Sequence, residues 1–237
     1  MSGWFGKPKS QTETTPSGAS VIRYPLNKWA SPLVGDADKS APRYNEARNN
    51  VYAKLFGEPS RVFETGGPHL PRVEVRAYKR RSKDGAETCA MVTSGMSDLP
   101  MNAPEGAEEF RRVELIFYCS EPRQEFADTM RFVAHFPHDQ NTWIHMGHTI
   151  PNGTPPAPFW GSAVLDTVLL MPTIVTKDRR LPEELVLDGD RVEFLWVVPI
   201  SAKECDLKLR EGLDAILSLF GRHRHPHVFD PNRSSYV

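Results

Sequence analysis

Cysteine is scarce in this chain, which has only three in 237 residues, Cys89, Cys119 and Cys205. An odd number at such wide spacing does not provide the disulfide framework that stabilises small secreted domains. Each of the three lies in apolar surroundings, where a free cysteine behaves as a small hydrophobic side chain. The sequence therefore predicts three buried thiols in a reducing compartment.

An excess of charge of one sign is also lacking. The 29 basic and 30 acidic residues leave a formal net charge of −1, so no strong field directs the chain to nucleic acid or to an anionic membrane. No apolar run reaches the roughly 20 residues that a membrane-spanning helix requires. The amino terminus has no hydrophobic segment typical of a secretory signal. We therefore expect a soluble, cytoplasmic protein with neither a nucleic-acid nor a membrane partner.

The common catalytic motifs are missing as well. The glycines at 66–67 are not followed by the lysine and hydroxyl residue of a phosphate-binding loop. The stretch 94–97 does not match the Gly-x-Ser-x-Gly turn of serine hydrolases, and nothing places His148 and Asp98 in a triad. The sequence therefore indicates no catalytic residue and no cofactor, which favours a binding function.

The period of the apolar residues suggests where ordered structure begins. Residues 7–20 are polar and rich in Ser, Thr and Pro, and prolines interrupt 25–43, so residues 1–44 are expected to form a flexible, irregular leader. A helix is predicted from Asn45, a suitable cap, to Gly57, with apolar side chains at helical spacing between them. From Arg61 the period becomes two, which predicts strands and a hairpin with its tip at 84–85.

Further strands and helices follow in the rest of the chain. Strands are predicted at 112–118, 164–171 and 192–200, the last of them central in the sheet. One helix is expected after Pro122, ending around 135–137, with the apolar stripe Phe126, Met130, Val133 and Ala134. Another begins at the capping box Ser201–Glu204 and ends at Gly221, with Leu209, Leu213, Ile216, Leu217 and Phe220 as its buried stripe.

Turns rather than helices join most of these strands. This favours an α+β fold with a largely antiparallel or mixed β-sheet flanked by helices. Residues 45–237 are expected to form a single domain, and 222–237 an extended carboxy-terminal tail. Alternating histidines and arginines at 222–227 indicate that this tail is basic and mobile.

Four imidazoles lie close together in the sequence, at His135, His138, His145 and His148. The two-residue gap within each pair is compatible with a zinc site. However, no cysteine falls in this window and Asp139 is the only acid nearby, so histidines that face solvent or form hydrogen bonds are the simpler interpretation. A metal-dependent hydrolase that uses this cluster is the alternative to a binding function.

Two stretches are candidates for contact with a partner, 94–101 and 141–153. Their methionines and Trp143 could provide an adaptable apolar surface, or could belong to the core. An unpaired sheet edge and aromatic anchors are the features that protein-binding domains commonly use to hold a partner.

Several motifs, taken in order, resemble the Suppressor of fused domain family. They are Val92-Thr93-Ser94-Gly95-Met96-Ser97-Asp98-Leu99-Pro100-Met101, Arg112-Val113-Glu114-Leu115, the stretch from Gly147 to Gly153, Phe194 to Ile200 with Glu204 and Gly212, and Phe229 to Ser234. The similarity spans about residues 45–237. It implies an α+β domain that binds proteins and has no catalytic activity.

The resemblance covers two kinds of members. In eukaryotic members it implies that a transcription factor of the Hedgehog pathway is held, as an added strand, between this domain and a second carboxy-terminal domain. The present chain ends where that second domain would begin, and His135 and Gly147 replace the tyrosine and aspartate of the eukaryotic pattern. That ligand is therefore not transferred to this chain. Stand-alone bacterial members are similar to immunity proteins, which bind and neutralise a toxin domain.

The sequence hypothesis is therefore a non-enzymatic, protein-binding domain, an immunity protein of a polymorphic toxin system. A metal-dependent hydrolase and an intracellular scaffold or regulator that sequesters a protein partner are the alternatives. The expected partner contacts are Ser94, Met96, Ser97, Asp98, Met101, His135, Trp143, His145, His148 and Thr149. The hypothesis includes no catalytic residue, metal or cofactor, and it leaves the oligomeric state open.

Overall fold

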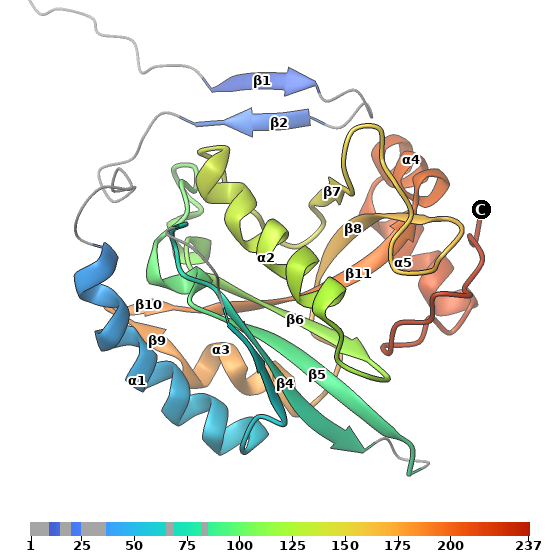
Figure 1. Cartoon of the computed structure of the whole chain (residues 1–237). Helices are drawn as coiled ribbons and strands as arrows, with labels where there is room; N and C mark the ends of the chain where they lie inside the picture. Colours follow the sequence, from blue (N-terminus) through green and yellow to red (C-terminus); the bar gives the residue numbers. More distant parts are fainter. Residues whose placement is uncertain (1–9, 15–19, 25–36, 65–68, 82–84) are drawn as a thin grey trace, which may run out of the picture.

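A seven-stranded mixed sheet forms the centre of the fold (Figure 1). The computed structural model describes residues 10–14, 20–24, 37–64, 69–81 and 85–237. In spatial order the strands are β3 (Arg61–Phe63), β4 (Glu74–Arg81), β5 (Glu87–Ser94), β6 (Val113–Cys119), β11 (Glu193–Ser201), β8 (Leu165–Pro172) and β7 (Thr149–Pro151). Strands β6 and β11 run parallel, and the other neighbours are antiparallel. The predicted α+β class with a mixed sheet is confirmed, and β11 lies inside the sheet.

Helices cover both faces of this sheet (Figure 1). They are α1 (Ala37–Phe56), α2 (Gln124–Asp139), α3 (Leu181–Glu184), α4 (Ala202–Glu211) and α5 (Leu213–Arg222). A short hairpin, β9 (Val186–Leu187) with β10 (Asp190–Arg191), precedes β11. Because successive side chains of a strand point to opposite faces, Leu115 packs on the α2 side, and Ile116 packs on the side of α1 and α5. The central strands are buried on both faces, which explains their almost continuous apolar sequence.

Helix α2 has the apolar stripe that the sequence predicts. Phe126, Met130, Val133 and Ala134 are all buried against the sheet. The helix extends beyond its predicted end and finishes at Asp139, with Pro137 in its last turn. Gln140 caps the helix and begins the segment that leads to β7.

The amino-terminal part contains more regular structure than the sequence indicates. Helix α1 begins at Ala37 rather than at Asn45, and β1 (Gln11–Thr14) pairs with β2 (Ser20–Arg23) in an antiparallel hairpin within the expected leader. The other positions of the leader, 1–9, 15–19 and 25–36, lie outside the described residues, as does Asp84 at the predicted hairpin tip.

The predicted carboxy-terminal helix is divided into two. The capping box is confirmed, because the Ser201 hydroxyl accepts from the N–H of Glu204 and the Glu204 carboxylate accepts from the N–H of Ser201. Gly212 then turns the chain at a φ of 89°, which separates α4 from α5. Leu209 and Leu217 are consequently exposed, contrary to the single buried stripe predicted, and α5 ends at Arg222.

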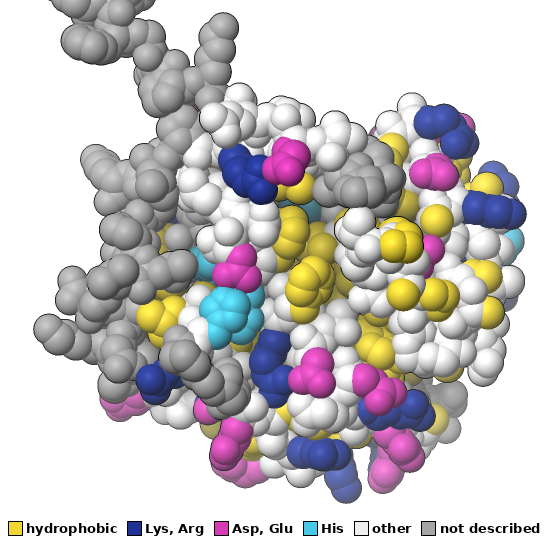
Figure 2. Space-filling model, turned by 45° about the horizontal axis from the view of Figure 1, so that its top comes forward, with side chains coloured by type: hydrophobic (Ala, Val, Ile, Leu, Met, Phe, Trp, Pro, Cys, Tyr) yellow, Lys and Arg dark blue, Asp and Glu magenta, His cyan; other side chains and the backbone are white. Residues whose placement is uncertain are grey.

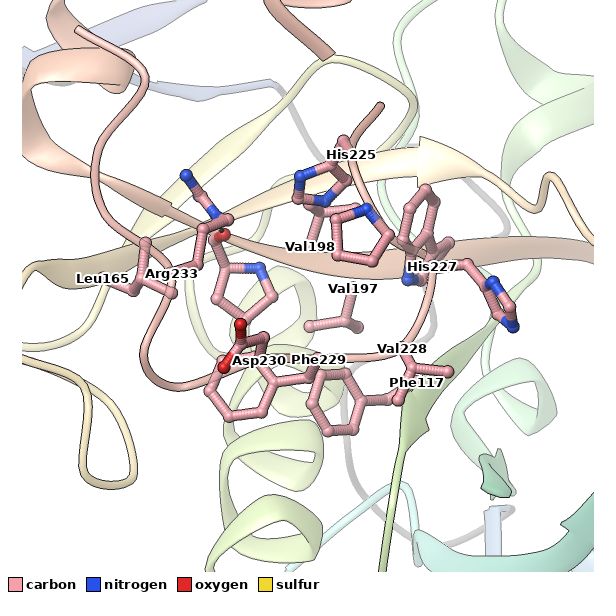
Figure 3. Close-up of a pocket in the computed structure, with 13 residues that line it drawn as sticks. Phe117, Leu165, Val197, Val198, His225, His227, Val228, Phe229, Asp230 and Arg233 are labelled. Atoms are coloured by element: carbon pink, nitrogen blue, oxygen red, sulfur yellow. Dashed lines mark hydrogen bonds between the residues drawn. The ribbon is translucent and has the colours of Figure 1, made fainter. Parts of the chain in front are cut away.

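The tail is docked on the body of the domain, so the prediction of a mobile tail was wrong. The N–H of Phe229 donates to the Tyr118 carbonyl at 2.8 Å, and Arg233 is paired with the buried Glu204. Figure 3 shows the residues from His225 to Arg233 lying against Phe117 and Val197. The space left between tail and sheet is about 10 Å³, which is enough for one water molecule at most.

The cysteines are where the sequence predicts them. Cys89, Cys119 and Cys205 are free and buried. In the part of the chain that the structure describes, no helix has the length and apolar character needed to cross a membrane.

Candidate protein-interaction groove

Most of the stretch 94–101 is buried in the core, and only Leu99 and Pro100 of this stretch are partly exposed. Its turn folds around the buried carboxylate of Glu114, which accepts from the N–H groups of Gly95 and Ser97 at 3.0 Å each. The hydroxyl of Ser97 donates to the same carboxylate at 2.6 Å, and the hydroxyl of Thr93 donates at 2.7 Å. Four donors thus satisfy a charge that would otherwise be costly to bury.

Asp98, in the same turn, is a second buried carboxylate with a partner. It forms an ion pair with Arg48 of α1, and both side chains are buried. Burial raises the pKa of Asp98 to about 6, although the adjacent guanidinium acts in the opposite direction. Arg112 donates to the carbonyls of Ser97 and Asp98 at 2.6 and 3.1 Å. This network attaches α1 to the sheet.

Five of the expected partner contacts must therefore be corrected. The structure buries each of them almost completely, and they are Ser94, Met96, Ser97, Asp98 and Met101. A residue without accessible surface cannot touch a partner while the domain stays folded. The mixture of small and polar residues in this stretch serves internal hydrogen bonds and packing instead.

The histidines of the 135–148 window do not come together in one place. His135 donates from Nε2 to the Pro71 carbonyl at 2.9 Å and stacks on His69, with 4.1 Å between ring centroids. His145 lies between Trp143 and Phe110, at 5.5 and 4.3 Å from their ring centroids. Among the described residues, no group of three or more His, Cys, Asp or Glu side chains is arranged to hold a metal ion.

Two of these imidazoles are uncharged at neutral pH. Burial lowers the pKa of His138 and of His148 to about 4 in each case. For His148, the nearby Lys208 lowers the pKa further. At neutral pH, His148 therefore contributes a neutral imidazole to its surroundings rather than a positive charge.

An open groove of about 550 Å³ lies between β2, α2, β7 and α4. Trp143, His148 and Thr149, three of the predicted contact residues, line it together with the buried Ile144 and Ile150. Hydrophobic side chains gather in a hollow of the face shown in Figure 2. At the rim, Ile22, Phe132 and Leu209 are 38%, 49% and 47% exposed. His135 and His145 do not line this groove.

The groove has a positively charged side chain in its lining and no negatively charged one among the described residues. None of its described lining residues is acidic, and Lys208 is the formally charged one. Partial burial lowers the pKa of this lysine. Its ammonium forms no ion pair within the described part of the chain. An apolar groove with a single unpaired cation favours an apolar ligand that carries a negative group.

Strand β7 supplies an open sheet edge along the groove. Its residues Thr149, Ile150 and Pro151 pair with β8 on one side. Across the described residues, no strand pairs with its other side. An edge strand next to an apolar groove is the arrangement with which many domains accept an additional strand from a partner.

Sequence reasoning missed other residues of the site. Thr142, Ile144 and Ile150 line the groove within the segment already selected, whereas Phe132 and Lys208 come from helices distant in sequence. One local signal was available, because the exposed Phe132 of α2 lies outside the buried stripe of that helix.

Comparison with protein-family models assigns the fold to a family. The model described as Suppressor of fused protein (SUFU) matches residues 70–234. The chain belongs to the Suppressor of fused family. No curated protein sequence matches the chain.

Solved structures of family members have the same fold. A homologue from Neisseria gonorrhoeae superposes with a TM-score of 0.62 at 17% identity, over 83% of this chain and 98% of that one. A chain from the Sufu-Fu complex gives 0.53 at 14% identity, over 83% and 92%. Drosophila Suppressor of Fused gives 0.55 at 13% identity, over 83% of this chain and 51% of its own length.

Proposed function

We propose that this Suppressor of fused family chain is a protein-binding domain that takes an extended segment of its partner into the groove. The observation that supports this most directly is the open edge of β7 beside an apolar groove of about 550 Å³. A segment added to β7 would gain main-chain hydrogen bonds, and its apolar side chains would pack against Trp143 and Ile150.

The chemistry of the groove limits which segments fit. Two or more apolar side chains are needed to cover the exposed rim at Phe132 and Leu209. An acidic side chain or a terminal carboxylate would pair with Lys208, which has no acidic neighbour in the described lining. We therefore propose a segment that is extended, apolar and acidic at one position.

The partner that we propose is a toxin domain, which the chain neutralises by direct binding. This choice follows from the family resemblance, which implies that stand-alone bacterial members are similar to immunity proteins. A relative was crystallised in a Sufu-Fu complex, which is consistent with protein binding in the family. A scaffold role would use the same groove with a partner that is not toxic.

Sequencing of the flanking genes, followed by co-expression with any toxin domain that they encode, tests the proposal. Cells should survive, and the two chains should co-purify as a complex. Truncation of an aromatic anchor at the centre of an interface costs about 2–4 kcal/mol, so Trp143→Ala should weaken binding by roughly 30-fold or more. Val186→Ala, an exposed change on β9 outside the groove lining, should not weaken it.

Two results would contradict the proposal. One is a lethal toxin in the presence of the folded chain, and the other is a complex that Trp143→Ala leaves unchanged. Thermal unfolding of each variant shows that the fold is retained. Elemental analysis addresses the hydrolase alternative, because a stoichiometric transition metal in the purified protein would favour it.

A further inference from the structure

Part of the groove is already occupied by the chain itself. Strand β2 and Tyr24 lie along it, and Ser20, Val21, Ile22 and Tyr24 are among its lining residues. The hydroxyl of Thr142 donates to the Ile22 carbonyl at 2.6 Å. The side-chain amide of Asn102 donates to the Tyr24 carbonyl at 2.9 Å, and that of Asn141 donates to the same carbonyl at 3.4 Å.

These contacts are of the kind that holds an extended peptide. The donors are side chains of the domain, and the acceptors are the main-chain carbonyls of Ile22 in β2 and of Tyr24 directly after it. Every sequence possesses such carbonyls. Among the described residues, the domain contacts a β2 side chain through one hydrogen bond, which Arg23 donates to the Gln140 side chain at 2.7 Å. Another extended segment with suitable apolar side chains could therefore accept the same hydrogen bonds.

The hold on β2 is weak. The strand has four residues, and its hydrogen-bonded strand partner is β1, whose residues are all exposed. A two-stranded hairpin by itself is marginally stable in water. Ile22 remains 38% exposed in the groove. Among the described residues, β2 is thus held by β1 and by the groove, and we expect its local release to require little free energy.

We propose that β2 is a tethered competitor, which occupies part of the groove in the partner-free chain and is displaced by the extended segment of a partner. This inference rests on the proposed function, because it concerns regulation of the same groove. A tethered segment acts at an effective concentration in the millimolar range. It therefore reduces the apparent affinity for any second segment in proportion to its occupancy.

The probe for the test is a fluorescent synthetic peptide with the sequence of residues 19–25, Ala-Ser-Val-Ile-Arg-Tyr-Pro. Its binding is measured by anisotropy to the full chain and to the full-chain variant Val21→Gly/Ile22→Gly. The glycines remove the apolar contacts of β2, so the variant should bind the peptide at least about tenfold more tightly. The exposed change Val186→Gly on β9 is the matched control and should bind like the parent chain.

A second variant tests where the peptide binds. Thr142→Val keeps the shape of the side chain but removes the donor to the Ile22 carbonyl. When it is added to Val21→Gly/Ile22→Gly, the tighter binding should be lost. Circular dichroism verifies that every variant is folded, and the partly exposed positions of β2 lie outside the two core clusters.

Equal peptide affinity in the parent and in Val21→Gly/Ile22→Gly would overturn the inference, and so would an absence of binding to both. Binding that persists with Thr142→Val would also contradict it. The assay contains no partner protein, so it can fail while a toxin complex forms. Conversely, a missing toxin complex leaves the competition result intact, and the two failures can be distinguished.

Discussion

Replacement of Arg233 by methionine should destabilise the domain strongly and in a pH-dependent way. Arg233 donates to the two carboxylate oxygens of Glu204 at 2.7 and 2.9 Å, and to the Pro199 carbonyl at 3.0 Å. Glu204 is completely buried, and Arg233 is 9% exposed. Loss of one partner of such a pair leaves a buried, uncompensated charge, which costs about 3–5 kcal/mol. That is a large share of the roughly 5–15 kcal/mol by which domains are stable.

The pKa of Glu204 determines how this loss depends on pH. Burial by itself would raise this pKa, but hydrogen bonds from Arg233, and from the N–H groups of Ser201 and Tyr236, hold it below its ordinary value. The parent chain therefore gains stability above the unfolded-state pKa of about 4.3 and loses it as the pH falls further. In Arg233→Met the burial effect dominates, so the folded-state pKa rises and the penalty disappears below about pH 4.

Urea denaturation of parent and variant from pH 7 to pH 4 measures the difference. The loss should be largest at pH 7 and should shrink toward pH 4. The double variant Glu204→Gln/Arg233→Met should be less destabilised than Arg233→Met at pH 7, because no buried charge remains. Arg210→Met, at an exposed position of α4, should stay within about 0.5 kcal/mol of the parent. A loss below about 1 kcal/mol that does not vary with pH would refute the reasoning.

Three further predictions concern other buried groups. A Cβ at Gly95 would lie 2.0 Å from the Arg72 carbonyl oxygen, and the φ of Gly95 is +122°. Gly95→Ala should therefore lower the free energy of unfolding by about 3 kcal/mol or more. Gly85 has open space around it, so Gly85→Ala should lower the free energy of unfolding by only about 1 kcal/mol, and equal losses would contradict the prediction. The three thiols should react with a thiol reagent only after unfolding, and rapid labelling of the native chain would contradict their burial. Burial lowers the pKa of His225 to about 4, so the midpoint of its NMR titration should lie well below the ordinary value of about 6.5. Because the unfolded chain takes up this proton near pH 6.5, the free energy of unfolding should fall as the pH is lowered from 6.5 to 4.

The two pH effects can be separated. Burial lowers the pKa of His225 in both proteins. In the parent the charge of Arg233 lowers it further, and Arg233→Met removes that effect. The contribution of His225 to the slope should therefore be somewhat smaller in the variant. The double variant Glu204→Gln/Arg233→Met provides the reference, since it lacks both charges of the pair.

Local patterns in the sequence were sufficient for the fold class and for several of the elements. The stripe of α2 and the Ser201–Glu204 capping box involve residues a few positions apart, and alternation along β4 and β5 marks the hairpin. Such signals depend on the period of the backbone itself, which is 3.6 residues in a helix and two in a strand. They therefore remain visible without any knowledge of distant neighbours.

The sequence by itself determined the class of the fold, most of its strands, the burial of the thiols and the family. Only the tertiary structure decided that the turn at 94–101 is internal, because its partners Glu114 and Arg48 come from β6 and α1. It also decided that the tail is docked and that Ile22, Thr142 and Leu209 meet in one groove. Contacts between segments so far apart leave no periodic trace in the sequence, since they arise only when the chain packs.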